Sequence, residues 1–321
     1  MRRDHGGNLD EAMARWGAGD WIDLSTGINP VPYPLPPIPA RAWAALPTAA
    51  DMGALSAAAR AAYGTPVEVV PLAGAQAAIQ ILPRLSPPGP VRVLAPTYNE
   101  HAAAFRAAGR TVEEVRDPAA LEGAAVAVVV NPNNPDGRRH APGALVALSA
   151  RTRLLIVDES FVETDPDLSL APALGDVPNA VVLRSFGKFY GLAGLRLGFA
   201  LAAPDLAARL REAAGPWPVS GPAIHVGAAA LGDAAWRDRT RHRLSGDAAR
   251  LDGLARTAGW SPAGGTDLFR TYAVPDAAHA QKRLASHRIW SRIFPRTPGW
   301  IRLGLPPPEG WPHLVAALGA A

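Results

Sequence analysis

Residues 184–198, Arg-Ser-Phe-Gly-Lys-Phe-Tyr-Gly-Leu-Ala-Gly-Leu-Arg-Leu-Gly, decide the fold and the chemistry of this 321-residue chain. Only two lysines occur among its 32 cationic side chains, and one of them, Lys188, lies in this stretch. Lysine, unlike arginine, can lose its proton and attack a carbonyl to form an imine. The apolar run 180–183 leads into Ser185, and Arg196 follows the lysine by eight residues. The segment therefore predicts a strand end that presents a hydroxyl, an amine and a guanidinium to an aldehyde cofactor with a phosphate.

This segment resembles the lysine signature of the fold type I, aspartate-aminotransferase-like pyridoxal-phosphate enzymes, Ser-x-x-Lys followed by arginine eight residues later. More narrowly, Lys-Phe-Tyr-x-x-x-Gly-Leu-Arg-Leu-Gly and the opening His5-Gly-Gly-Asn8 are similar to the threonine-phosphate decarboxylases of cobalamin synthesis. The resemblance implies an α/β fold with a mostly parallel central sheet flanked by helices and a smaller α/β C-terminal domain. It also implies pyridoxal 5'-phosphate as the cofactor and a homodimer as the assembly.

The alternation of strand and helix patterns along the chain supports the same fold. Residues 124–130 form a continuous apolar run, as expected of a strand that is covered on both faces. Strands separated by helices imply a mostly parallel sheet, in which ligands bind beyond the carboxyl ends of the strands. The predicted strands are 67–71, 91–95, 124–130, 154–157 and 180–183, and the predicted helices are 52–63, 74–82, 101–108, 142–150, 206–214 and 222–243. The last two helices lead to the segments 268–273 and 300–304, which suggest a second α/β unit.

We expect three regions along the chain. Residues 1–40 are predicted to form an N-terminal arm that packs on the small domain and the active site, because the proline-rich stretch 31–39 can form neither a helix interior nor a central strand. Residues 41–205 are predicted to form the large cofactor-binding domain. Residues 206–321 are predicted to form the smaller C-terminal domain.

Composition excludes several classes of protein. A hydrophobic content of 48% with 19% charged residues is typical of a globular chain. Because cysteine is absent, disulfides, thiolate metal sites and a cysteine nucleophile are excluded, and we expect no metal. No apolar stretch approaches the roughly 20 residues that cross a bilayer, and the start of the chain does not look like a signal peptide. The net charge of +4 comes from scattered arginines, so we expect a cytoplasmic protein that binds neither a membrane nor nucleic acid.

Two side chains are candidates for catalysis on the predicted cofactor. Lys188 would form the imine, whereas Lys282 lies on a predicted solvent-facing helix and serves as the comparison. Asp158, at the end of the strand 154–157, is in place to keep the ring nitrogen protonated, so that the ring can accept electrons from the broken bond. The alternative for Asp158 is an ordinary aspartate at a strand end.

A phosphate site is predicted where a helix begins. Gly74, Ala75 and Gln76 open this helix, and its free N–H groups and dipole suit a dianion. Ser185 and Arg196 would close the site from the lysine segment. A glycine before a helix is common on its own, so this prediction depends on the other motifs.

The resemblance also implies a clamp on the cofactor ring. Asn134 would hydrogen-bond its phenolic oxygen, and Tyr98 would stack on its face, an aromatic contact worth about 1 kcal/mol. A simple turn and a core tyrosine are the alternatives. Phe161 stands where many of these enzymes have tyrosine, and Gly187 where a second Ser or Thr is usual. Leu46 stands where the class has a tyrosine that reaches the partner subunit's phosphate, so we expect no such contact.

Arginines near the C-terminus are candidates for substrate binding. Arg302 resembles the C-terminal carboxylate-binding arginine of the class, and Arg292 lies nearby in the sequence. More than one arginine suits a substrate that carries a phosphate as well as a carboxylate. By the resemblance, the N-terminal arm folds over the pocket, and its candidate substrate-binding residues are His5, Gly6, Asn8 and Asn29.

The resemblance implies decarboxylation of L-threonine O-3-phosphate to (R)-1-amino-2-propanol O-2-phosphate. Phosphoserine stays an alternative substrate, because one methyl group is worth only about 1–3 kcal/mol in a pocket. The alternative reaction is amino transfer on a phosphorylated substrate such as histidinol phosphate, which also calls for several arginines. A third hypothesis is a regulator that binds pyridoxal phosphate and DNA. It would need an added DNA-binding segment, whereas this sequence opens directly with the arm.

Overall fold

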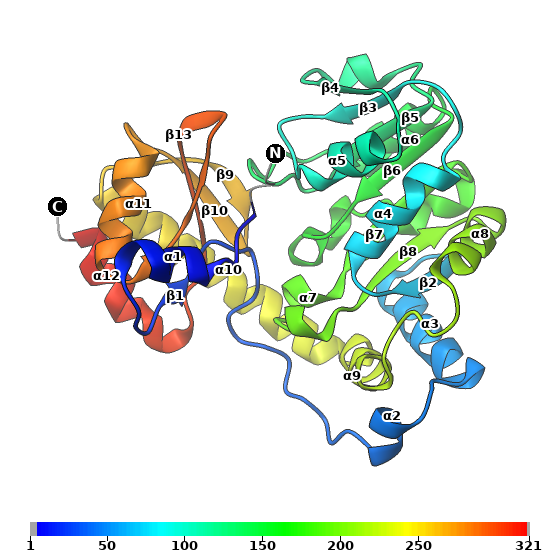
Figure 1. The fold of residues 1–321 in the computed structure, drawn as a ribbon, viewed down its shortest axis with the longest axis horizontal. Helices are drawn as coiled ribbons and strands as arrows, with labels where there is room; N and C mark the ends of the chain where they lie inside the picture. The colour runs from blue at the N-terminus through cyan, green and yellow to red at the C-terminus, as the bar shows by residue number, and fades with distance from the viewer. Residues whose placement is uncertain (1–4, 320–321) are drawn as a thin grey trace. The chain divides into compact units, whose positions relative to one another are not determined.

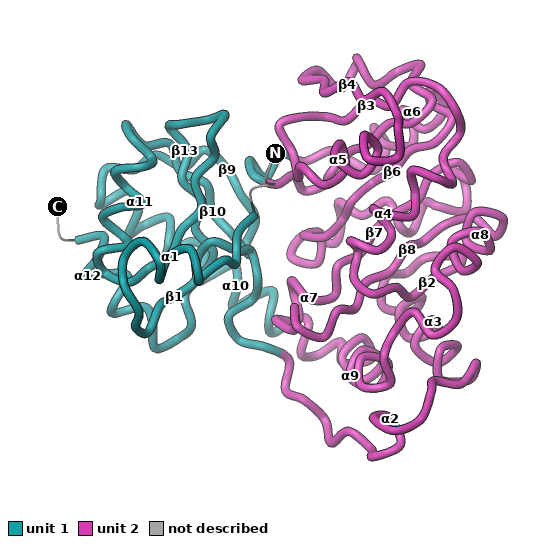
Figure 2. Tube along the Cα trace, in the orientation of Figure 1, with its two compact units in different colours: residues 1–32, 135–138, 238–321 teal, residues 33–134, 139–237 magenta. Residues whose placement is uncertain are grey.

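The computed structural model describes residues 5–319, which form two compact units (Figure 2). Unit 2 contains Tyr33–Asn134 and Arg139–Arg237. Unit 1 contains the described residues up to Pro32, the short segment Pro135–Arg138, and the described residues from Asp238 onward. The chain therefore crosses between the units immediately after Asn134.

The core of unit 2 is a seven-stranded sheet with the strand order β2-β8-β7-β6-β5-β3-β4 (Figure 1). The four pairs from β4 to β7 are parallel, whereas β8 runs antiparallel to both β7 and β2. The mostly parallel sheet predicted from the sequence is therefore confirmed. Its strands are β2 (Glu68–Leu72), β3 (Val91–Leu94), β4 (Val112–Val115), β5 (Val126–Val130), β6 (Leu154–Asp158), β7 (Ala180–Ser185) and β8 (Gly198–Ala202).

Helices cover this sheet and complete its core. Those of unit 2 are α2 (Ala40–Ala44), α3 (Ala49–Tyr63), α4 (Ala75–Leu85), α5 (Glu100–Ala107), α6 (Pro142–Ser149), α7 (Phe186–Phe189), α8 (Pro204–Ala214) and α9 (Gly221–Gly232). The apolar sides of α4, α5 and α8 pack with the strands into one buried cluster. Because α8 packs on α4 and β2, and α9 packs on α3, residues 206–237 lie in unit 2 and not with the C-terminal strands.

Unit 1 has a four-stranded antiparallel sheet with the order β12-β13-β10-β9, and a parallel pair formed by β1 and β11. The segments 268–273 and 300–304, which were predicted to belong to a second α/β unit, contain β10 and the end of β13. The elements are α1 (Leu9–Trp16), β1 (Ile22–Asp23), α10 (Ala234–Thr257, from Asp238 onward), β9 (Ser261–Thr266), β10 (Phe269–Ala273), α11 (Ala277–Ser286), β11 (Ile289–Trp290), β12 (Arg292–Phe294), β13 (Thr297–Gly304) and α12 (Trp311–Gly319). Among the helices between residues 5 and 319, none has the length and apolarity needed to cross a bilayer.

Some elements differ from the sequence-based prediction. The single helix predicted at 222–243 was wrong, because the chain breaks at Asp233. The Asp233 side chain accepts a hydrogen bond from the Trp236 amide (2.9 Å) and so starts a new helix. The helix α1 and the strands β4 and β8 were not predicted. The strand β8 begins at Gly198, the last residue of the lysine segment.

Candidate active site

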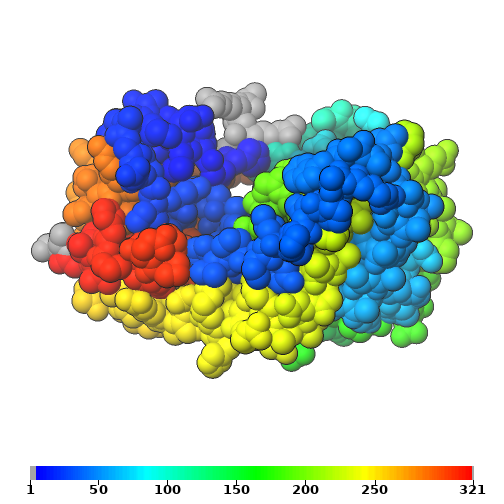
Figure 3. All heavy atoms as spheres, turned by 90° about the horizontal axis from the view of Figure 1, so that it is seen from below, coloured from blue at the N-terminus to red at the C-terminus, as the bar shows by residue number. Residues whose placement is uncertain are grey.

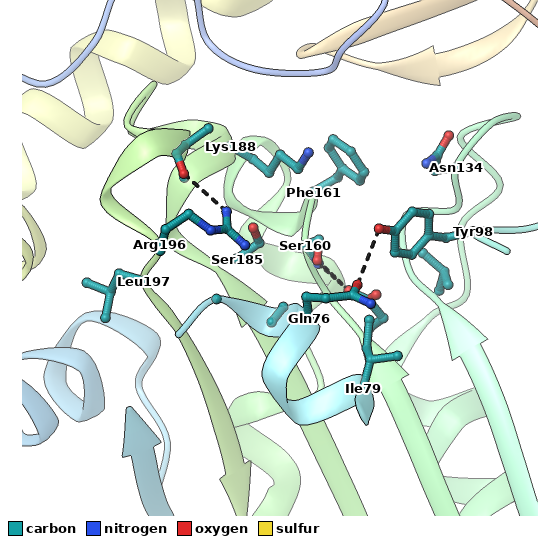
Figure 4. Close-up of a pocket in the computed structure, with 16 residues that line it drawn as sticks. Gln76, Ile79, Tyr98, Asn134, Ser160, Phe161, Ser185, Lys188, Arg196 and Leu197 are labelled. Atoms are coloured by element: carbon teal, nitrogen blue, oxygen red, sulfur yellow. Dashed lines mark hydrogen bonds between the residues drawn. The ribbon is translucent and has the colours of Figure 1, made fainter. Parts of the chain in front are cut away.

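A pocket in unit 2 lies beyond the carboxyl ends of β5, β6 and β7 (Figure 4). The structure brings together in its lining all nine residues that the sequence predicted for the cofactor: Gly74, Ala75, Gln76, Tyr98, Asn134, Asp158, Ser185, Lys188 and Arg196. Its other lining residues are Ile79, Val130, Ser160, Phe161, Gly187, Ala193 and Leu197. The strand-end rule thus located the pocket, and the motifs located its side chains.

Asp158 is the buried carboxylate of the pocket. Its Oδ2 lies 2.8 Å from Nε2 of His101, and its Oδ1 accepts hydrogen bonds from the amide (3.0 Å) and the hydroxyl (2.5 Å) of Ser160. Burial by itself raises the pKa of Asp158, but the hydrogen bond and charge of His101 and the two Ser160 bonds outweigh it and hold the pKa below its usual value. Asp158 is therefore an anion suited to hold a protonated ring nitrogen.

Sequence reasoning missed His101 and Ser160. His101 lies in the first turn of α5 with its side chain only 2% exposed, and it reaches Asp158 across 57 positions of sequence. The only local signal for His101 was its place three residues after Tyr98. Ser160 could have been found from its place two residues after Asp158, where a serine commonly bonds back to the aspartate.

The glycine turn before α4 forms a site for an anion. Gly74 has φ +81° and ψ 161°, and no described side chain caps the helix, so the N–H groups of Ala75 and Gln76 face the pocket end. The Arg196 guanidinium lies beside this turn, with Nη2 3.0 Å from the position that a Cβ on Gly74 would take. Arg196 itself has a left-handed backbone (φ +53°). Ser185, at the end of β7, is the remaining donor.

Lys188 lies on the short helix α7, directly after β7. Its Nζ is 5.7 Å from the centre of the Phe161 ring, and Figure 4 shows the amine directed toward that ring. Phe161 offers an apolar face but no hydroxyl. A Cβ on Gly187 would come within 2.7 Å of the Ala193 Cα, so a larger residue could be accommodated here only if the backbone shifted.

Tyr98 is held by a chain of hydrogen bonds. Its hydroxyl donates to Oε1 of Gln76 (3.3 Å; Figure 4), and the Gln76 amide donates to Oε2 of Glu100 (2.8 Å). Its ring meets His101 edge-on, with 6.2 Å between centroids. The Tyr98 ring therefore has a fixed orientation against the pocket.

Asn134 ends a loop that is tied to the Tyr98 loop. The neighbouring Asn133 donates to the carbonyl of Pro96 (2.9 Å) and accepts from the hydroxyl of Thr97 (2.6 Å). These bonds bring the two loops together over 36 positions of sequence. They place Tyr98 and Asn134 on the same pocket, as a ring clamp requires.

Comparison with known proteins identifies the family. Residues 42–318 match the model described as aminotransferase class I and II. The chain belongs to this family. Threonine-phosphate decarboxylase from Pseudomonas aeruginosa is 47% identical, with 98% of this chain and 97% of the relative covered, and that from Sinorhizobium sp. is 45% identical (94% and 93%). Among solved structures, histidinol-phosphate aminotransferase from Sinorhizobium meliloti in complex with pyridoxal-5'-phosphate superposes with a TM-score of 0.80 at 22% identity (97% and 93%).

The aminotransferase pocket fits each part of the predicted cofactor. Lys188 supplies the amine, Asp158 a carboxylate whose pKa lies below its usual value, and the N-terminus of α4 an anion site without a capping side chain among the described residues. The fold-type I prediction is confirmed by the family match and by the superposition.

The candidates for substrate binding belong to unit 1, where Ser25 connects several of them. A Cβ on Gly6 would lie 2.2 Å from the Ser25 carbonyl oxygen, so only glycine fits there. The Gly7 amide donates to the Ser25 hydroxyl (2.7 Å), and Nη2 of Arg302 donates to the Ser25 carbonyl (2.6 Å). Arg302 on β13 pairs with Arg292 on β12. The arm and the two arginines therefore meet within this unit.

The two guanidinium groups share one aromatic ring. That of Arg292 lies 5.5 Å from the Phe294 centroid and that of Arg302 lies 6.0 Å from it.

The other residues predicted to bind the substrate lie elsewhere in the arm. Asn8 precedes α1, His5 is exposed, and the buried Asn29 accepts a hydrogen bond from Nη2 of Arg243 (2.6 Å).

Proposed function

We propose that this protein is a pyridoxal-phosphate-dependent decarboxylase that converts L-threonine O-3-phosphate to (R)-1-amino-2-propanol O-2-phosphate. The observation that carries the proposal is its near-full-length relationship to two threonine-phosphate decarboxylases. The pocket lined by Lys188, Asp158 and the phosphate-site residues supports it. The product would serve cobalamin synthesis.

When bound, pyridoxal phosphate withdraws electrons from the bond at Cα that breaks. In this reaction the bond from Cα to the carboxylate carbon breaks, CO2 leaves, and Cα takes up one proton. Lys188 would hold the cofactor covalently through Nζ before the substrate binds. Asp158 keeps the proton on the ring nitrogen, because His101 and Ser160 keep the Asp158 carboxylate charged.

The other pocket residues bind and orient the cofactor. The amides of Ala75 and Gln76, the hydroxyl of Ser185 and the guanidinium of Arg196 would hold its phosphate. Tyr98 would cover the ring, with its own hydroxyl engaged by Gln76. Asn134 would donate to the phenolic oxygen, while Phe161 would supply no second donor there.

Arginines bind the substrate's two anionic groups. The paired Arg292 and Arg302, close to the same Phe294 ring, suit a carboxylate and a phosphate on one small molecule. The arm residues His5, Gly6, Asn8 and Asn29 would add donors. This assignment explains why a phosphorylated amino acid would be preferred over its unphosphorylated form.

We further propose a homodimer that uses the segment 33–48. In this segment Leu35, Trp43 and Leu46 are 60, 69 and 63% exposed, an unusual concentration of large apolar side chains on a surface. Figure 3 shows the segment in blue beside the yellow α9, on which α2 packs. Light scattering would measure the number of subunits, and a monomer at all concentrations would contradict the proposed homodimer.

The cytoplasmic location stays a prediction.

The test offers L-threonine O-3-phosphate as the sole substrate to protein reconstituted with pyridoxal phosphate. We expect CO2 and aminopropanol phosphate in equal amounts without any keto acid, and far slower turnover of unphosphorylated threonine. Arg292→Ala and Arg302→Ala should each raise the KM for the phosphorylated substrate. Amino transfer from histidinol phosphate to 2-oxoglutarate, with no CO2 from phosphothreonine, would instead support the aminotransferase hypothesis.

A further inference from the structure

A buried ionic network lies next to two residues of the pocket but does not line it. Arg184 is on β7, and its Nε lies 3.2 Å from Oε2 of Glu159 and its Nη1 lies 3.0 Å from Oε1 of Glu163. Its Nη2 donates to the hydroxyl of Ser169 (2.8 Å). The side chains of Arg184, Glu159 and Glu163 are only 5, 0 and 11% exposed.

The remaining contacts of the network fix each charged group. Glu159 accepts hydrogen bonds from the Leu170 amide (2.7 Å) and the Ser169 hydroxyl (2.8 Å). The Arg184 guanidinium stacks over the Tyr63 ring at 4.5 Å. Buried ion pairs contribute little net stability, because removing two charges from water costs about as much as their attraction returns. Replacing such a pair with apolar residues of similar volume often leaves the protein equally stable or more stable. A role in placing the backbone accounts better for two carboxylates and a guanidinium at this depth.

Each end of the network is next to a residue that contacts the cofactor site. Glu159 follows Asp158 and Arg184 precedes Ser185, and successive side chains along a strand point to opposite faces. Asp158 and Ser185 line the pocket, whereas Glu159 and Arg184 are not among its lining residues. The register between β6 and β7 ends at the pair Asp158 and Leu183, and the Glu159 amide still donates to the Leu183 carbonyl (2.9 Å). The Arg184–Glu159 ion pair adds a side-chain contact between the two strand ends at the same place.

We propose that Glu159 and Arg184 are positioning residues that set the distance between the ring-nitrogen partner Asp158 and the phosphate donor Ser185. The inference rests on the proposed function, because Asp158 and Ser185 would bind opposite ends of one rigid cofactor. A displacement of about 1 Å in a catalytic site can lower the reaction rate by about 100-fold. Glu163 contacts the same guanidinium but is five positions from Asp158, so it should stabilise the network without setting that distance.

The test compares Glu159→Gln with the matched control Glu163→Gln. Each change removes one buried negative charge next to Arg184 and keeps the size of the side chain. The apoprotein of each is titrated with pyridoxal phosphate, and the visible circular dichroism band of the bound cofactor and the melting temperature of the apoprotein are recorded. We expect both variants to melt at similarly reduced temperatures. Only Glu159→Gln should bind the cofactor roughly tenfold or more weakly and show an altered band.

Equal cofactor affinities and equal dichroism bands in E159Q and E163Q would overturn the proposal. If E159Q does not fold, Arg184→Lys answers the same question, because it keeps the charge but cannot bridge Glu159, Glu163 and Ser169 together. Cofactor affinity within twofold of wild type and an unchanged band in R184K would equally overturn it. Wild-type protein that binds no pyridoxal phosphate would refute the proposed function instead, so the two failures are distinguishable.

Discussion

Replacing Gly198 with alanine should weaken cofactor binding through the phosphate site. Gly198 begins β8, where a Cβ would lie 2.3 Å from the Ala75 nitrogen, 2.5 Å from the Gly74 carbonyl carbon and 2.9 Å from the Arg184 oxygen. All three are backbone atoms, so none can rotate away. An ordinary contact begins near 3.4 Å, and the Ala75 amide must therefore retreat by roughly 1 Å.

The size of the effect follows from this displacement. An N–H···O bond near 2.9 Å that lengthens by about 1 Å is no longer a hydrogen bond. A hydrogen bond to a charged group is worth about 1.5–3 kcal/mol, and each 1.4 kcal/mol is about tenfold in affinity. If Ala75 holds the phosphate, Gly198→Ala should weaken pyridoxal-phosphate binding by about 10- to 150-fold.

Absorbance titration of the apoprotein with pyridoxal phosphate measures this affinity, and far-ultraviolet circular dichroism checks that the variant folds. Gly194→Ala is the matched control, because Gly194 lies in the same lysine segment but a Cβ there meets no described atom within 4 Å. We expect Gly194→Ala to bind within twofold of wild type. Wild-type affinity in a folded Gly198→Ala variant, or equal losses in both variants, would refute the assignment of the phosphate site.

Three further outcomes are expected. Asp158→Asn should still bind pyridoxal phosphate but lose most turnover, since the ring nitrogen would no longer stay protonated; steady-state CO2 release measures this, and unchanged turnover would contradict the ring-partner role. Arg196→Ala should release the cofactor more readily on dialysis while Asp158→Asn retains it, and the reverse pattern would exchange the two assignments. Because the pKa of Asp158 is lowered in the fold, its stabilising effect is present above the unfolded value of about 3.9 and is lost as the pH falls below it. The melting temperature of the wild-type apoprotein should therefore fall more steeply between about pH 4 and pH 2 than that of Asp158→Asn. Parallel curves of melting temperature against pH would contradict the charged state of Asp158 in the fold.

The sequence predicted most of the pocket because its information is local. Ser185, Lys188 and Arg196 lie within twelve consecutive residues, so their spacing alone brings them to one end of the sheet. The apolar runs predicted two neighbouring strands, and Asp158 and Asn134 lie at or just after the ends of these strands. In a parallel sheet those ends meet at one edge, so independent motifs along the chain converge on one site.

What the sequence could not provide depends on pairing over long distances. The contact of His101 with Asp158, and that of Arg184 with Glu163, follow from the register and order of strands, which no local pattern contains. The break at Asp233 was missed because the alanine-rich residues on both sides of Gly232 and Asp233 favour a helix, and the capping bond of Asp233 cannot be read from composition. The antiparallel β8 was missed because its residues directly follow a glycine-rich segment that suggests a loop.

The most direct test of the central claim is to identify the lysine that carries the cofactor. Protein reconstituted with pyridoxal phosphate should be yellow, and borohydride reduction followed by peptide mass mapping should locate the adduct. The chain has one other lysine, Lys282, which is exposed on α11 and makes a built-in control. We predict the adduct on Lys188 alone. An adduct on Lys282, or no colour after reconstitution, would contradict the account.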